Sequence, residues 1–379
     1  MKILKRIFLS LISLILILII ALYVFDYNYL IKAVRTIYFT GHTTAYLEDY
    51  KKFDNTTIEA GTAQPWPHAK NYNNYTLSDE LMQIHKEFGS IAYMVIKNDS
   101  IVFEDYYDGF GQDSKSNSFS MAKSYVSALL GKAIKDGYIK SLDQPVGDFI
   151  SEYSEGTAAQ MTVGDLASMA SGLNWDESYY SPFSVTTRAY FDDHLEPVML
   201  GLGMKEKPGT GYKYLSGNTQ LLAMVLERAT GKKLADYLSE SLWKPLGANQ
   251  DALWQLDSEE GGLVKAYCCI ASNARDFARL GKLYKDYGEW NGKQILDSAF
   301  VAKSITPRFE GEPYGYGFWL KDFKDKKVFM MRGHLGQYVM VIPEDDLIVV
   351  RLGHSRGKTN ATGYPDEMDA YLEEAYKIN

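Results

Sequence analysis

The sequence predicts an α+β fold: one antiparallel sheet flanked by N- and C-terminal helices, with an inserted, mainly helical region and one transmembrane helix before the domain. Three observations support this prediction. β-rich runs occur near residue 91 and again after residue 316. The chain between about residues 145 and 305 shows mainly helical spacing with long loops. Strands at both ends of a helical middle are typical of one sheet that the terminal segments complete.

The N-terminus contains an uncharged apolar run, residues 7–25, behind a basic segment, residues 1–6. At about 1.5 Å per residue its length approaches the roughly 30 Å hydrocarbon core of a bilayer. A cleaved signal peptide would have a shorter apolar region and a small-x-small cleavage site, which the residues after Ala21 lack. We therefore expect an uncleaved, single-pass signal anchor in the cytoplasmic membrane. Its basic flank would stay in the cytoplasm, and the domain would face the periplasm or the cell exterior.

The chain after this run divides into a lead-in and a domain. Residues 26–78 are rich in Tyr, Thr and Asn and suggest a stalk and lead-in, so we expect the domain to cover residues 79–379. Ile91–Ile96 and Ile101–Tyr106 are β-rich runs separated by four polar residues, which predicts a hairpin. Apolar residues recur at helical spacing from Ser120 to Asp136, which predicts a long amphipathic helix.

The later elements follow the same reasoning from periodicity and turn residues. The expected helices are Thr162–Met169, Asn218–Thr230, Asn273–Tyr287 and a final one at Asp366–Lys377. The expected strands are Tyr316–Leu320, Val328–Arg332, Gln337–Ile342 and Leu347–Leu352. These strands and the early hairpin would share one sheet.

Composition excludes several classes of function. With 379 residues, 46% hydrophobic and 23% charged, the chain is ordinary for a globular protein, and its net charge of -8 offers no basic surface for nucleic acid. The only cysteines, Cys268 and Cys269, are adjacent. A disulfide between neighbours is possible but strained, so two buried thiols are the preferred interpretation. These cysteines and the six histidines show no metal-ligand spacing, so we expect no metal and no cofactor.

The strongest chemical signal is a Ser-x-x-Lys pattern at Ser120–Lys123. Positions i and i+3 share one helix face, and a lysine made neutral by burial could take the serine proton. Free N–H groups at the helix start would stabilise negative charge beside the serine. The pattern also occurs at Ser241–Lys244, which a proline follows, and at Ser355–Lys358, which has loop composition. Only Ser120 opens a long amphipathic helix.

Two further segments could face the same cleft. Pro208–Asn218 places Tyr214 just before a predicted helix, where its phenol could reach into a cleft. Arg332–Tyr338 leads into an apolar strand and includes Gly336, which would allow close approach of the backbone to a ligand. Both segments therefore offer groups that a reaction at Ser120 would need.

Together these segments resemble the serine β-lactamase and penicillin-binding protein superfamily, from about Tyr75 to Asn379. Within it, the chain looks most like the class C β-lactamase branch, which includes esterases and 6-aminohexanoate-dimer hydrolases. Ser120–Lys123 matches the first motif. Tyr214–Ser216 matches the second, and His334–Gly336 stands where the third is usually Lys-Thr-Gly. The matches lie in the family's order and spacing.

The resemblance implies a mechanism through an acyl-enzyme. Ser120 would attack a carbonyl carbon after giving its proton to Lys123 or Tyr214, which would titrate together. The N–H groups of Ser120 and Gln337 would form the oxyanion hole, where one donor is worth roughly 3–4 kcal/mol of barrier. Tyr214 would then pass a proton to the leaving group, and water would release the acyl group.

Two departures from the family pattern affect the expected substrate. The second motif usually ends in Asn, and Ser216 is shorter and lacks the paired donor and acceptor of an amide. His334 stands in place of a lysine and is mostly neutral near pH 7, which weakens the grip on a substrate carboxylate. We also expect Gly336 to contact substrate, and Tyr179 and Tyr180 to edge the cleft, with loop packing as the alternative for the two tyrosines.

The sequence therefore favours a serine hydrolase that cleaves an ester or amide, including a short peptide or 6-aminohexanoate-type substrate, outside the cytoplasm. The alternatives within enzymes are a D-alanyl carboxypeptidase or transpeptidase, or a β-lactamase. A different class is a ligand-binding or sensor protein without turnover, against which the complete set of Ser120, Lys123 and Tyr214 argues. The expected partners are a small-molecule substrate and the membrane, with no nucleic acid and no obligate protein partner.

Overall fold

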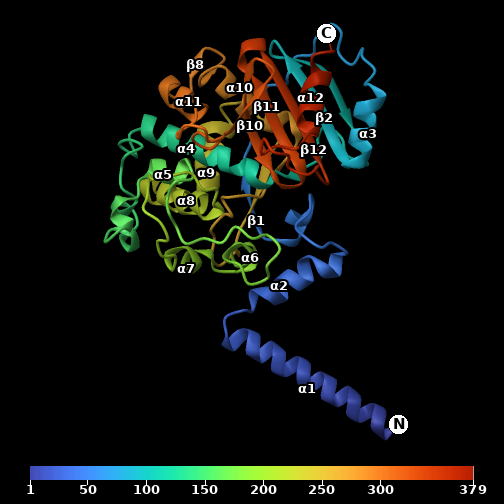
Figure 1. Cartoon of the computed structure of the whole chain (residues 1–379), viewed down its shortest axis with the longest axis vertical. Helices are drawn as coiled ribbons and strands as arrows, with labels where there is room; N and C mark the ends of the chain where they lie inside the picture. Colours follow the sequence, from blue (N-terminus) through green and yellow to red (C-terminus); the bar gives the residue numbers. More distant parts are fainter. Residues whose placement is uncertain (379) are drawn as a thin grey trace.

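A six-stranded antiparallel sheet forms the centre of the domain in the computed structural model, which describes residues 1–378 (Figure 1). In spatial order its strands are β3 (Ser100–Tyr106), β2 (Ser90–Lys97), β12 (Leu347–Gly353), β11 (Gln337–Ile342), β10 (Lys326–Gly333) and β9 (Trp319–Phe323). The N-terminal hairpin β2–β3 joins the C-terminal strands through β12, where Tyr93 pairs with Arg351. This arrangement confirms the predicted antiparallel sheet that strands from both ends of the chain complete.

Both faces of the sheet are covered by helices. On one face, Tyr93 and Met340 pack in a core with Leu81 of α3 (Asp79–Glu87) and Tyr371 of α12 (Glu367–Ala375). The next residues along the same strands, such as Met94 and Val341, point to the other face. There they pack with α10 (Ala274–Lys285) in the main core of the domain. Side chains alternate between the faces of a strand, so a sheet covered on both sides is apolar at nearly every position.

The helical region is built around one buried helix, α4 (Ala122–Lys135), which packs on α8 (Ser216–Thr230). Helix α5 (Val163–Ala167) begins with a capping box between Thr162 and Asp165, which satisfies its first free N–H groups. The other helices here are α6 (Val185–Phe191), α7 (Leu195–Leu200), α9 (Leu234–Leu238), the π-helical turn Ser239–Trp243 and α11 (Ser298–Ser304). The prediction of helices in this region is confirmed.

Periodicity alone did not indicate a second sheet, which combines two strands of this region with two from earlier in the chain. Its order is β1 (Asn55–Ile58), β5 (Ala252–Gln255), β6 (Ile270–Ser272) and β4 (Ser116–Asn117). A short hairpin, β7 (Glu289–Trp290) and β8 (Lys293–Gln294), lies apart from both sheets. The strands of the second sheet have two to four residues, too few to show a period of two.

Residues 26–78, for which the sequence suggested only a stalk and lead-in, are largely packed onto the domain. Strand β1 pairs with β5, and Leu47, Ile58 and Trp66 are buried in the main core. Earlier in the segment, α2 (Tyr29–Thr36) contacts α6. These contacts are with residues far along the chain, and the buried residues of α2 recur at helical spacing.

Helix α1 (Lys2–Val24) extends away from the domain, and none of its residues is buried (Figure 1). It is long and apolar enough to cross a membrane, although a signal sequence near the N-terminus would have the same properties. Helix α2 begins only a few residues after α1 ends. The α2 side of the domain must therefore lie close to the surface or partner that anchors α1.

Candidate active site

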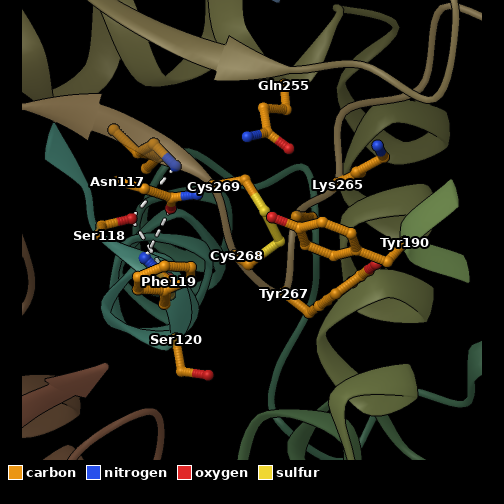
Figure 2. The surroundings of a disulfide bond; sticks show 12 residues. Asn117, Ser118, Phe119, Ser120, Tyr190, Gln255, Lys265, Tyr267, Cys268 and Cys269 are labelled. Atoms are coloured by element: carbon orange, nitrogen blue, oxygen red, sulfur yellow. Dashed lines mark hydrogen bonds between the residues drawn. A yellow bond between two sulfur atoms is a disulfide. The ribbon is translucent and has the colours of Figure 1, made fainter. Parts of the chain in front are cut away.

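Ser120 lies in a tight 3₁₀ turn, Phe119–Met121, that opens α4. Phe119 adopts a φ of +46°, a left-handed conformation that is costly for a residue with a side chain. Hydrogen bonds fix the chain on its way into the turn: Asn117 Oδ1 accepts from Phe119 N at 2.8 Å, and Ser118 Oγ accepts from Ile270 N at 3.1 Å. Figure 2 shows these residues leading to Ser120. The turn is thus imposed by well-anchored neighbours.

Lys123 lies one turn further along, with its side chain 2% exposed. Its Nζ is 3.0 Å from Ser120 Oγ and donates to the carbonyl oxygen of Tyr267 at 2.7 Å. Burial lowers the pKa of Lys123 to about 8, while the carboxylate of Glu177 raises it in part. A substantial share of neutral amine is therefore present close to neutral pH, as a proton acceptor beside a serine hydroxyl needs.

Tyr214 brings the third group to the same place, almost a hundred residues along the chain from Ser120. It precedes the extended residue Leu215, from which α8 begins, and its ring centroid lies 5.1 Å from Lys123 Nζ. Burial raises the pKa of Tyr214, and a hydrogen bond with Ser120 lowers it in part. The structure thus brings together the hydroxyl, the amine and the phenol that the sequence singled out.

Ser216 points to a carboxylate that sequence reasoning missed. Its N–H and Oγ each donate to Glu177 at 2.6 Å, and the Tyr179 hydroxyl donates to the same carboxylate at 2.5 Å. The only local signal was that Glu177 lies beside Tyr179, in a loop far from the three motifs. Glu177 therefore fixes Ser216 and Tyr179 and adds negative charge near Lys123.

His334 lies half-buried between two aromatic rings. It stacks on Tyr179, with centroids 5.7 Å apart, and meets the edge of Phe119 at 5.6 Å. Burial, with a smaller contribution from Arg356, lowers the pKa of His334 to about 4. The histidine is consequently neutral at pH 7 and brings no fixed positive charge to the site.

The residues after His334 are held by Arg351 and by backbone groups. A Cβ on Gly336 would lie 2.3 Å from Arg351 Nη1, and the φ of this residue is +84°, so packing and backbone conformation both favour a glycine here. Its contact with substrate stays a prediction. Gln337 begins β11, fully buried, and its amide donates to the carbonyl oxygens of Gly353 and His334 at 2.7 and 3.1 Å. The backbone at Gln337 is thereby held beside the Ser120 turn, which packs on β10 and β11.

Cys268 and Cys269 form a disulfide, so the expectation of two free thiols was wrong. Cys269 adopts a left-handed φ of +78°, and this departs from the extended geometry that points successive side chains to opposite sides. In Figure 2 the disulfide lies between the Ser120 turn and Tyr190. The preceding residue, Tyr267, carries the carbonyl that holds Lys123, so the disulfide adjoins one support of the site.

A cavity of about 410 Å³ opens onto Ser120. Five of the residues singled out from the sequence line it: Ser120, Tyr179, Tyr180, Ser216 and His334. Cys268 and Tyr267 line it as well, and its far wall is formed by α2. Helix α2 is the part of this cavity that the sequence did not indicate.

Comparison with known proteins agrees with this geometry. The family model described as Beta-lactamase matches residues 76–371. A 6-aminohexanoate-dimer hydrolase from Paenarthrobacter ureafaciens is 26% identical over 296 residues, covering 72% of this chain and 74% of the relative. A D-aminopeptidase from Brucella canis is 27% identical over 276 residues, covering 65% of this chain and 51% of the relative, so the match spans about half of that protein.

Solved structures share the fold at low sequence identity. A penicillin-binding protein homologue from Pyrococcus abyssi superposes with a TM-score of 0.63 and 22% identity, covering 79% of this chain and 76% of that one. A D-amino acid amidase from Ochrobactrum anthropi gives a TM-score of 0.58 and 17% identity, covering 78% and 95%. Because the family model matches most of the chain, and the relatives are hydrolases of amidase and peptidase type, the protein is a serine hydrolase that belongs to the Beta-lactamase family.

Proposed function

We propose that the protein cleaves an ester or amide through an acyl-enzyme on Ser120, on the outer side of the membrane that α1 crosses. The observation that supports this most directly is the position of the buried Lys123 amine, 3.0 Å from Ser120 Oγ, together with the phenol of Tyr214. The basic residues before the apolar helix support the proposed orientation.

The reaction follows from these groups. Neutral Lys123, or Tyr214 as the phenolate, takes the proton of Ser120 as Oγ forms a bond to the substrate carbonyl carbon. The N–H groups of Ser120 and Gln337 stabilise the resulting oxyanion. The phenol of Tyr214 then gives a proton to the leaving alcohol or amine as the bond to the carbonyl carbon breaks. Where Lys123 took the serine proton, its ammonium passes that proton to Tyr214 and both groups return to their starting forms. Water then attacks the acyl-enzyme, and its proton returns Ser120 to the hydroxyl form.

Charge at the site favours a substrate without a carboxylate next to the cleaved bond. His334 is neutral at pH 7, and Glu177 places a carboxylate behind Ser216. A substrate carboxylate beside His334 would meet a neutral imidazole where the family pattern has a lysine, and it would lie near the Glu177 carboxylate. This argues against efficient cleavage of β-lactams and D-alanyl peptides and in favour of neutral esters and amides.

A substrate screen tests the proposal. The full-length protein in mild detergent is assayed with p-nitrophenyl esters, an aminohexanoate dimer, a D-alanyl-D-alanine peptide and a chromogenic cephalosporin. We expect steady release of product from esters or the neutral amide, abolished in Ser120→Ala. A single burst without turnover would indicate a sensor, and a preference for the cephalosporin or the D-alanyl peptide would overturn the proposed substrate class.

A further inference from the structure

The cavity connects the nucleophile with the segment next to the membrane helix. At one end it is lined by Ser120 and Ser216, and at the other by Ala33, Val34 and Ile37, on α2 and just after it. Helix α2 is held against the domain by contacts with α6 and by an ion pair between Lys32 and Asp193. The wall opposite Ser120 is therefore a fixed part of the site.

The lining of this cavity is suited to a hydrocarbon chain. Among residues 1–378, those that line it include no Asp, Glu, Lys or Arg side chain. His334, the one ionisable imidazole in the lining, is neutral at pH 7 because burial lowers its pKa to about 4. Apolar ligands gain free energy from leaving water for such a surface, whereas a charged substrate group would lose its hydration without finding a partner.

The rim of the cavity carries aromatic side chains whose exposure to water is unfavourable. Tyr180 lines the cavity and is 79% exposed; Phe183, in the same loop, is 67% exposed, and Phe39, which follows α2, is 80% exposed. Aromatic residues in such positions are typical of the membrane–water interface. A large exposed apolar surface also marks a binding site for a membrane or a partner.

The chain between α1 and α2 keeps this rim near the membrane. Asp26 pairs with Arg188 of α6, and the ring of Tyr27 packs edge-on against Phe183, with centroids 5.6 Å apart. The linker is thus tied to the same loop that carries the rim. If α1 lies in a bilayer, the rim lies within a few residues' reach of its surface.

We propose that the substrate is a membrane amphiphile: its long hydrocarbon chain lies in the cavity along α2, its ester or amide carbonyl reaches Ser120, and it enters from the bilayer past Phe39, Tyr180 and Phe183. This inference rests on the proposed function, because it names the substrate class of the same site. A hydrocarbon chain that fills the cavity is removed from water. Because a single methylene in an apolar pocket changes kcat/KM by about tenfold or more, the length of this chain should strongly affect the rate.

Chain-length preference tests the cavity. With the full-length protein in mild detergent, we expect kcat/KM for p-nitrophenyl dodecanoate to exceed that for the acetate by about a hundredfold or more, after correction for uncatalysed hydrolysis. Val34→Trp fills the α2 wall and is expected to lower this ratio at least about tenfold. Ile31→Trp adds the same bulk to α2 at an exposed position outside the lining and should leave the ratio unchanged.

A separate measurement tests whether the substrate enters from the bilayer. The double substitution Phe39→Ser with Phe183→Ser should lower the rate on the dodecanoate ester embedded in phosphatidylcholine vesicles relative to the rate on the same ester dispersed in detergent. Equal rates on short and long esters, or a ratio that Val34→Trp does not change, would overturn the inference about the chain. An unchanged ratio of vesicle to detergent rates in the double variant would overturn entry from the membrane. Hydrolysis that survives Ser120→Ala would instead overturn the proposed function itself.

Discussion

The two ends of the cavity are built differently. At the nucleophile end, Ser120 and Lys123 are held by hydrogen bonds to groups within the large core of the domain. At the α2 end, the wall belongs to a small separate core of Tyr29, Ala33, Ile37, Phe53 and Phe191. Hydrogen bonds therefore position the reacting groups, whereas apolar packing mainly positions the wall that we propose contacts the substrate.

The largest expected effect is at the nucleophile end. Lys123→Ala removes the proton acceptor beside Ser120, so kcat/KM should fall about 10²–10⁴-fold. Since the α2 wall is untouched, acetate and dodecanoate esters should lose the same factor. Steady-state kinetics with both esters measure this, and Lys132→Ala, which removes a lysine that pairs with Asp136 on the outside of α4, is the matched control. A loss confined to one ester would contradict the separation of the two ends.

At the α2 end we expect a loss of stability. Ala33→Asp places an unpaired carboxylate in the small core, which should destabilise the folded protein by about 3 kcal/mol. Thermal unfolding of the full-length protein in detergent measures the change. Arg35→Asp makes the same carboxylate on the exposed face of α2 and should stay within about 0.5 kcal/mol of the parent. Equal effects of the two substitutions would show that Ala33 is not enclosed.

The disulfide adjoins the nucleophile end, because Cys268 lines the cavity and follows the residue whose carbonyl holds Lys123. Reduction should let the Tyr267 carbonyl shift by a fraction of an ångström. Because a misplacement of 1 Å costs about 10²-fold in rate, we expect kcat/KM to fall by up to about tenfold. Activity with and without a phosphine reductant measures this. The double variant Cys268→Ala with Cys269→Ala should show the lower activity and no response to the reductant. A variant as active as the oxidised parent would separate the disulfide from the site.

The smallest effect concerns pH. Neutral Lys123 is the active form, so kcat/KM should rise as the pH increases through the pKa of about 8. The carboxylate of Glu177 raises this pKa, so Glu177→Gln should move the rising limb to lower pH. A pH–rate profile with the acetate ester measures the shift, and a move to higher pH would contradict the assignment of Lys123.

The sequence predicted what local patterns encode. The helix that Ser120 opens has apolar residues at helical spacing, and β2, β3 and β11 are β-rich runs, so the fold class followed from them. The meeting of Ser120, Lys123 and Tyr214 was expected from the resemblance of the three motifs to the family. The oxyanion role of Gln337 stays a prediction.

What the sequence missed depends on contacts between distant segments. Glu177 reaches Ser216 across 39 positions, and α2 reaches the cavity from more than eighty positions before Ser120. Contacts of this kind come from tertiary packing, so single-sequence periodicity contains no record of them. The disulfide is a different case, because the adjacent cysteines were visible in the sequence but two buried thiols were preferred.

The proposed mechanism requires the amine of Lys123 for activation of the Ser120 hydroxyl, either as the proton acceptor itself or together with Tyr214. Intact-mass and peptide-mass analysis of the full-length protein after brief exposure to a fluorophosphonate tests it most directly. The account predicts one adduct, located on Ser120, absent in Ser120→Ala and formed far more slowly in Lys123→Ala than in Lys132→Ala. An adduct on another residue, or labelling of Ser120 at the parent's rate in Lys123→Ala, would contradict it.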